Sequence, residues 1–418
     1  MPEDSLPFQV GDCSINGYRA LGSAEFALGP TNLVVGVNGA GKTTVLRALA
    51  LLLEDIARRI GPSTVEGQKP NSFDARGKTI RLYAEIVAES APHYLSRIWK
   101  EADGAVTERR PTTSMSGAAT LAKIYWQSLD DEEEDEKTLP LLCFYPISRT
   151  VSEIPLKARK EEPGSRRDAY ARAFTAERHF ASFFQWFREL EDYENESGRK
   201  RDPHLKAVRK AIETAMPGYT NLRVSRRPRL RMLIDKGDEM LSIQQLSDGE
   251  QGVLTLIGDI ARRAAILNPH LKDPLASPGC VLVDEIDQHL HPQWQRRVVE
   301  TMRKVFPNLQ FVFTSHSPIV CGSVEPDSLL VLREGHVESR SVYGWSIADI
   351  LKSIFDVDER PQSVHNDLLE LDKALDRGDL KAARKTLSGL LDVLPETDPE
   401  VVRANVLLPI LEEAARSR

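Results

Sequence analysis

The stretch Gly36–Thr44, with the sequence GVNGAGKTT, constrains the fold of this 418-residue chain more than any other. It fits the spacing G-x-x-x-x-G-K-S/T, which chance alone would produce in about one in a hundred chains of this length. An apolar run, Leu33–Val35, precedes it, and a helix-forming run, Val45–Leu53, follows it. A strand, a glycine loop and a helix bring backbone N–H groups and the positive end of a helix dipole to a phosphate. We therefore predict a nucleotide-binding P-loop.

The motif assigns a role to each of its residues. Lys42 would reach the β- and γ-phosphates, and the Thr43 hydroxyl would bind Mg²⁺. The other predicted contacts to the nucleotide are Asn38, Gly39, Ala40, Gly41 and Thr44. A nucleoside triphosphate and Mg²⁺ are thus the expected cofactors.

Composition excludes some classes of protein. The net charge of −7 argues against a surface that coats nucleic acid broadly, although it allows a local basic groove. No apolar run approaches the roughly 20 residues of a membrane helix, and the acidic start does not resemble a signal peptide. The four cysteines are far apart and form no C-x-x-C pair, which is typical of buried thiols in a reducing compartment. We expect a cytoplasmic protein with no membrane partner.

A second motif, Leu246–Gln251, opens a helix that is predicted to continue to Leu267. Ser247 and Glu250 have the spacing of a capping box, which explains both residues locally. The helix N-terminus at Gly249 would also present a positive dipole to a phosphate. The motif therefore has a structural and a nucleotide-binding interpretation.

A third motif ends the apolar run Cys280–Val283 with two carboxylates, Asp284 and Glu285. This is the Walker B pattern. Because successive strand residues point to opposite faces, the two carboxylates can do different work. Asp284 would hold Mg²⁺, and Glu285 would take a proton from the attacking water.

A fourth motif is a strand, Phe311–Thr314, followed by His316. Ser317 is predicted to cap the next helix, with Pro318 at its first position. Ligands bind at the carboxyl edge of parallel sheets, so His316 can donate to a γ-phosphate there. His289 and His291 form an H-x-H pair, which we interpret as part of the loop after Glu285 rather than as a metal site.

Arginines alternate with apolar residues in the segment Asn221–Leu233, which predicts two short strands. The arginines fit either a solvated sheet face or a contact to a nucleic-acid backbone. No aromatic residues interleave with them, so stacking on single strands is not supported.

The order of these four motifs resembles that of ABC-type ATPases, and within them the soluble RecF, SMC and OLD proteins. The run Asp284–Arg297 is more particular. Together with Leu246–Ile260 and Phe306–Pro318, it resembles the stand-alone ATPases of anti-phage defence, the Septu-type PtuA proteins that are also found with retrons. The resemblance covers most of residues 10–340.

The resemblance implies an α/β fold: an ABC-type ATPase head with a mixed or parallel central sheet, an inserted helical lobe and a C-terminal helical tail. Residues 1–150 would form the N-terminal part of the core with the P-loop, and 151–240 the inserted lobe with its basic strands. Residues 241–343 would complete the core, and 344–418 would be helical. The periodic segment Leu380–Leu391 fits either packing against the chain's own sheet or docking of a partner.

The resemblance also implies a mechanism in which ATP and Mg²⁺ hold a head-to-tail homodimer together and hydrolysis releases it. Ser247, Gly249 and Glu250 of one copy would meet the nucleotide bound by the other. The implied partners are an HNH-type nuclease and, in retrons, a reverse transcriptase with its RNA–DNA hybrid. The alternative is a RecF-like repair ATPase that binds DNA directly.

The chain departs from the ABC pattern in two places. Asp248 stands where transporters usually have glycine, and a carboxylate repels a triphosphate, so Asp248 is expected to point away or to cap the helix. The strand ending at Tyr145 is not followed by the glutamine often found where the helical lobe begins. Arg149 is a candidate for the contact that the glutamine would make.

Overall fold

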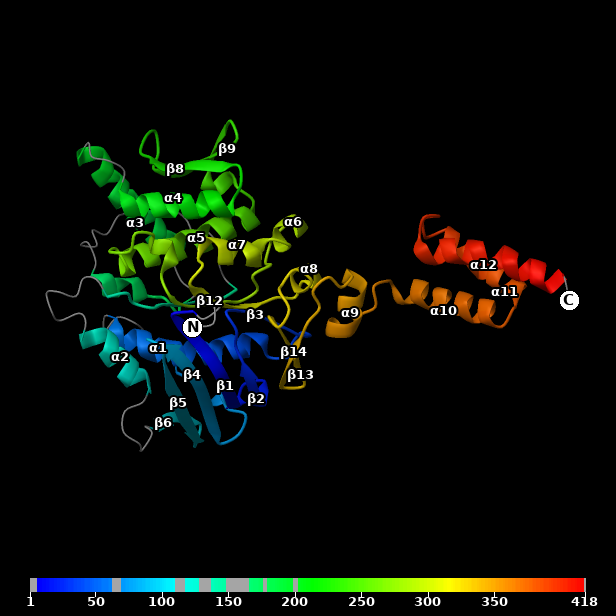
Figure 1. Ribbon diagram of the computed structural model, residues 1–418, viewed down its shortest axis with the longest axis horizontal. Helices are drawn as coiled ribbons and strands as arrows, with labels where there is room; N and C mark the ends of the chain where they lie inside the picture. The colour runs from blue at the N-terminus through cyan, green and yellow to red at the C-terminus, as the bar shows by residue number, and fades with distance from the viewer. Residues whose placement is uncertain are drawn as a thin grey trace. The chain divides into compact units, whose positions relative to one another are not determined.

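The computed structural model describes residues 6–61, 69–109, 117–127, 137–147, 165–175, 179–197 and 202–416. The chain divides into two compact units, Met1–Trp345 and Ser346–Arg418. Figure 1 shows the path of the chain through each unit.

A six-stranded sheet lies at the centre of the first unit. Its order is β14 (His336–Arg340), β13 (Leu329–Arg333), β3 (Thr31–Val35), β12 (Leu309–Thr314), β11 (Gly279–Val283) and β7 (Leu141–Tyr145). All neighbours pair in parallel except β13 and β14. Every residue of β3, β7, β11 and β12 is buried, as in a sheet covered on both faces. The predicted mixed sheet is confirmed, and the P-loop, Asp284 and His316 follow the ends of three adjacent strands.

A second, antiparallel sheet has the order β2 (Leu21–Ala27), β1 (Phe8–Tyr18), β4 (Thr79–Ala88), β5 (Ala91–Ala102) and β6 (Ala105–Arg109). Helix α1 (Lys42–Ile60) contacts strands of both sheets and lies between them (Figure 1). Helix α2 (Gly117–Gln127) packs on α1 and β5. The P-loop helix is thereby held in a buried layer.

The inserted lobe combines helices with a small sheet. Helices α3 (His179–Ser197) and α4 (Pro203–Ala215) pack against α5 (Asp248–Leu267). Strands β8 (Tyr219–Ser225), β9 (Arg231–Lys236) and β10 (Glu239–Ser242) form an antiparallel sheet in the order β10, β9, β8. The two strands predicted around the arginines are therefore confirmed.

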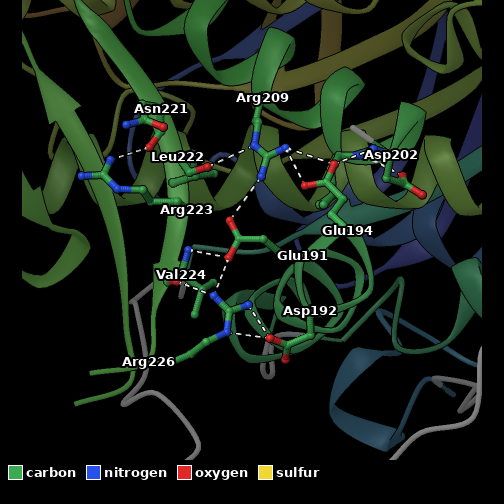
Figure 2. Close-up of polar contacts among 11 residues, drawn as sticks. Glu191, Asp192, Glu194, Asp202, Arg209, Asn221, Leu222, Arg223, Val224 and Arg226 are labelled. Carbon is green, nitrogen blue, oxygen red and sulfur yellow. Dashed lines mark hydrogen bonds and ion pairs between the residues drawn. The ribbon is translucent and has the colours of Figure 1, made fainter. Parts of the chain in front are cut away.

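Some of those arginines hold the lobe together, as Figure 2 shows. Buried Glu191 of α3 accepts from Arg209 Nη2 at 3.2 Å, from Arg226 Nη1 at 3.0 Å and from the Val224 N–H at 3.0 Å. Arg226 also pairs with Asp192, next to Glu191 on α3. These ion pairs fix β8 on α3 and α4. Arg226 therefore makes ion pairs within the chain, rather than lying free on a solvated sheet face.

Short helices complete the first unit: α6 (Pro292–Gln295), α7 (Val298–Val305) and α8 (Pro318–Cys321). The second unit contains α9 (Ile347–Phe355), α10 (Gln362–Asp376), α11 (Leu380–Leu391) and α12 (Pro399–Arg416). Leu387 and Leu390 of α11 pack in one core with Leu371 of α10 and Val401 of α12. The apolar face of α11 thus packs against its neighbouring helices, which neither of the two interpretations of this segment predicted. Within the described ranges, no helix has the length and apolar character needed to cross a membrane.

Candidate nucleotide-binding site

The P-loop backbone adopts conformations that favour glycine. Gly36, Gly39 and Gly41 have φ angles of 155°, 80° and 110°. A Cβ on Gly36 would lie 2.5 Å from the carbonyl oxygen of Leu332, so no larger residue fits there. Gly41 directly precedes α1, so the loop leads straight into the N-terminus of that helix.

Lys42 lies in the first turn of α1 and is buried. Its Nζ donates to the carbonyl oxygens of Gly36, at 2.9 Å, and Val37, at 3.1 Å. Burial lowers the pKa of Lys42, while the carboxylates of Glu285 and Asp284 act to raise it. The ammonium group is therefore hydrogen-bonded to the loop and interacts electrostatically with both Walker B carboxylates.

Asp284 is also buried and receives two hydroxyl groups on one oxygen. Thr43 Oγ1 donates to its Oδ1 at 3.2 Å, and Thr314 Oγ1 donates to the same atom at 2.5 Å. The Thr314 oxygen in turn accepts the Glu285 N–H at 2.7 Å. Two adjacent oxygen ligands of octahedral Mg²⁺ lie about 3 Å apart, so the Thr43 and Asp284 oxygens fit this ion.

Glu285 and His316 face each other at the carboxyl edge of the sheet. Glu285 has a φ of 48°, and its Oε1 lies 3.9 Å from His316 Nε2. Both side chains are about one-third exposed, whereas Asp284 is buried. Burial, and then the charge of Lys42, lower the pKa of His316, although Glu285 acts to raise it. These effects favour the neutral imidazole, whose single ring N–H can donate one hydrogen bond.

His289 and His291 lie in the loop between β11 and α6, as predicted. His291 caps α6, and its Nδ1 accepts the Gln293 N–H at 3.3 Å. The described part of the chain contains no group of three or more His, Cys, Asp or Glu residues that could hold a metal ion. Ser317 caps α8 with Pro318 at the first helical position, as predicted.

The signature motif at the start of α5 is tied to its own chain. Ser247 Oγ accepts the Glu250 N–H at 3.4 Å, and Glu250 accepts the Ser247 N–H at 2.8 Å, so the predicted capping box is confirmed. Glu250 also accepts from the Tyr219 hydroxyl and from Lys236 Nζ. Burial acts to raise the pKa of Glu250, but these hydrogen bonds lower it to about 2. Glu250 therefore fixes the helix start on β8 and β9.

Gly249 and Asp248 also have positions that the sequence did not predict. A Cβ on Gly249 would lie 2.4 Å from the carbonyl oxygen of His289, so α5 packs directly on the loop that follows Glu285. Since Ser247 is the cap, the alternative in which Asp248 caps the helix is wrong. Asp248 instead lines a cavity of about 760 Å³ together with Trp294 and Arg297.

The structure brings Lys42, Thr43, Asp284, Glu285 and His316 together at one edge of the sheet. Among the described residues, no hydrogen bond or ion pair connects Ser247, Gly249 or Glu250 to Lys42. Arg149 lies outside the described residues. Sequence reasoning missed Thr314, whose hydroxyl contacts both Walker B residues. The functional roles of all these residues stay predictions.

Parts of the chain match known families and known proteins. Residues 12–217 match a family described as "AAA domain", and residues 141–322 match "AAA domain, putative AbiEii toxin, Type IV TA system". The retron Ec83 probable ATPase of Escherichia coli is 27% identical over 433 residues, covering 84% of this chain and 77% of that protein. The Septu protein PtuA of Bacillus thuringiensis is 31% identical over 111 residues, covering 23% of this chain and 28% of PtuA.

A solved SMC head, bound to the C-winged helix domain of ScpA, shares the fold. It has a TM-score of 0.51 at 15% identity and covers 80% of this chain and 98% of the SMC head. At that identity the similarity shows the fold alone, an α/β ATPase head. Together, the AAA-domain matches, the retron and Septu relatives and this fold support an ABC-type ATPase related to PtuA.

Proposed function

We propose that this chain is the switching ATPase of an anti-phage defence complex, and that two copies assemble head to tail around two ATP molecules. The similarity to a retron ATPase over most of both chains carries this proposal. The geometry of the site supports the proposal, because ATP hydrolysis requires the phosphate-binding, Mg²⁺-binding and basic groups in one place. The structure has these groups at one sheet edge: Lys42, Thr43, Asp284 and Glu285.

Within one copy, each side chain would have a separate task. Lys42 would contact the phosphates, and Thr43 and Asp284 would hold Mg²⁺, which neutralises charge on the β- and γ-phosphates when bound. Glu285 is partly exposed and can accept a proton from the attacking water. His316 would donate to the γ-phosphate through a ring N–H, and its lowered pKa favours the neutral imidazole.

The second copy would complete the site through its signature motif. The Ser247 hydroxyl accepts a hydrogen bond in its own cap, so its O–H can still donate to a phosphate oxygen. The N-terminus of α5 adds positive dipole. Because Glu250 and Gly249 fix this helix end on its own chain, the donors would be preorganised for the γ-phosphate.

The proposed partners follow from the resemblance to Septu and retron systems. A separate HNH-type nuclease would act as the effector, and a retron reverse transcriptase with its RNA–DNA hybrid would join it. ATP binding would hold one state of this complex, and hydrolysis would release it.

The test uses tagged Glu285→Gln protein, which should bind ATP but hydrolyse it far more slowly. Recovery from the native host with Mg-ATP should yield a nuclease, with or without a reverse transcriptase and RNA. Lys42→Ala protein is the control that should not recover them. Ser247→Arg should prevent ATP-dependent pairing without weakening ATP binding by the monomer. Recovery of a homodimer with DNA and no nuclease would contradict the defence proposal.

A specific observation favours the alternative, a RecF-like ATPase that binds DNA. Arg227, Arg229 and Arg231 lie exposed at the β8–β9 hairpin, whereas Arg226 is ion-paired. Three such arginines could neutralise backbone phosphates. Replacing all three with alanine should reduce the salt dependence of DNA binding by about 2 to 3 in log–log slope.

The matched control removes three exposed cations from the antiparallel sheet: Arg81, Lys100 and Arg109. An equal decrease of the slope in this control would show that DNA binding depends only on the net charge of the protein. An unchanged slope in the hairpin variant would exclude the hairpin as a DNA contact.

A further inference from the structure

Tyr145 connects two parts of the ATPase that the known motifs leave separate. It is the last residue of β7 and is only 1% exposed. Its hydroxyl donates to Asp259 Oδ2 at 2.8 Å, and Asp259 lies in the middle of the signature helix α5. The strand that borders β11 is thus hydrogen-bonded to the helix that begins with the signature motif.

The acceptor of this hydrogen bond is itself fixed. Arg262 Nη2 donates to Asp259 Oδ1 at 2.6 Å, and Arg263 Nε donates to Oδ2 at 2.7 Å. Arg263 also donates to the carbonyl oxygens of Ala169 and Ala171. All three charged side chains are buried, so moving one would leave an uncompensated charge. The cluster therefore sets the position and rotation of α5 at Asp259.

The backbone of Tyr145 contacts Asp284, at the sheet edge where the proposed catalytic residues lie. Its carbonyl oxygen accepts the Asp284 N–H at 2.8 Å, continuing the parallel pairing of β7 with β11. Asp248, at the start of α5, lies eleven residues before Asp259, which is about 16 Å along a rigid helix. Tyr145 thus bonds to the backbone of Asp284, the residue proposed to hold Mg²⁺, and to the signature helix α5.

We propose that Tyr145 is a positioning residue that couples Asp284 to the signature end of α5 through Asp259. The proposal rests on the head-to-tail dimer of the proposed function. In that dimer Asp284 serves the ATP of its own copy, and Ser247 serves the ATP of the other copy. The Tyr145–Asp259 contact therefore links the two ATP sites. It supplies a connection between β7 and α5 in a chain whose sequence has no glutamine in the four residues after Tyr145.

Tyr145→Phe tests the contact because it removes one hydroxyl and keeps the ring. We expect kcat for ATP hydrolysis to fall about tenfold, the loss typical of one hydrogen bond to a charged group. ATP affinity should stay within about twofold, because the P-loop contacts are kept. In the Glu285→Gln background, ATP-dependent dimerisation should weaken by a similar factor of about ten.

Tyr170→Phe is the matched control. Tyr170 is also 1% exposed, and its hydroxyl donates to the Pro140 carbonyl at 2.6 Å. The substitution removes the same group from a buried site without touching Asp259. It should lower thermal stability as Tyr145→Phe does, but leave kcat within about twofold of the original protein.

A double-mutant cycle separates positioning from stability. If Tyr145 acts through the start of α5, its effect on kcat should shrink when Ser247→Ala is already present. Additive effects, or equal kcat values for Tyr145→Phe and Tyr170→Phe, would overturn the proposal. If Glu285→Gln protein stays monomeric with ATP, the dimer of the proposed function fails. The comparison of kcat between the two tyrosine variants still decides whether Tyr145 positions the site.

Discussion

The Thr314 hydroxyl gives the sharpest prediction for hydrolysis. Thr314 is fully buried, and one oxygen atom donates to Asp284 and accepts from the Glu285 backbone. Thr314→Val removes that oxygen and keeps the shape of the side chain. The variant therefore disturbs both Walker B residues without creating a large cavity.

The magnitude follows from the two contacts. A hydrogen bond to a charged group contributes about 1.5–3 kcal/mol, and an unsatisfied buried N–H costs about 1–3 kcal/mol. The first contact orients the carboxylate predicted to hold Mg²⁺, so its loss should appear in kcat as a decrease of about ten- to a hundredfold. The second should appear mainly as a lower free energy of unfolding.

The assay combines steady-state phosphate release with equilibrium binding of a fluorescent ATP analogue and urea unfolding. Thr314→Ser keeps the hydroxyl and should retain kcat within about threefold, although it loses a methyl group. Hydrolysis by Thr314→Val at the original rate would refute the role of this oxygen. A Thr314→Ser variant as slow as Thr314→Val would show that the methyl packing, rather than the hydrogen bonds, is responsible.

Three further predictions concern the loop and the signature. Lys42→Ala should abolish ATP binding, and normal nucleotide affinity in a filter assay would overturn the P-loop assignment. Gly249→Ala should slow hydrolysis at least tenfold by pushing the His289 carbonyl aside, whereas Gly252→Ala, which meets no atom within 4 Å, should be neutral or slightly stabilising. The pKa of Glu250 is lower in the folded chain, about 2 against 4.5, so the unfolded chain binds more protons. Its stabilising contribution is present above pH 4.5 and lost as pH falls towards 2. In urea unfolding, the stability difference between the original protein and Glu250→Gln should shrink over that range.

The sequence was sufficient where one local pattern determines the structure. Uninterrupted apolar runs predicted the buried strands β3, β11 and β12, because a strand covered on both faces needs no polar residues. The glycine spacing predicted the loop before α1, and the Ser247–Glu250 spacing predicted the start of α5. In each case the residues that determine the local structure are close together in the chain.

The remaining features depend on packing between distant segments. Thr314 lies 30 residues after Asp284, and only the adjacency of β11 and β12 brings the two together. Arg226 donates to the carboxylate of Glu191 on α3, which lies 35 residues earlier in the sequence. Asp259 and Arg263 have the i,i+4 spacing of an exposed helix pair, yet they are buried. The residues next to Thr314, Arg226 and Asp259 in the sequence therefore do not indicate these roles.

The signature motif shows why a motif match alone does not assign a role to each residue of the motif. Gly249 is small because the His289 carbonyl occupies the space of a side chain, and Glu250 holds the helix on β8 and β9. Both residues are therefore required by their own chain, whether or not a second copy binds. What remains for a partner's phosphate is the Ser247 O–H and the positive end of α5. Substitutions at Glu250 should thus act through stability and pH, whereas substitutions at Ser247 should weaken ATP-dependent pairing in addition to the stability lost with the helix cap.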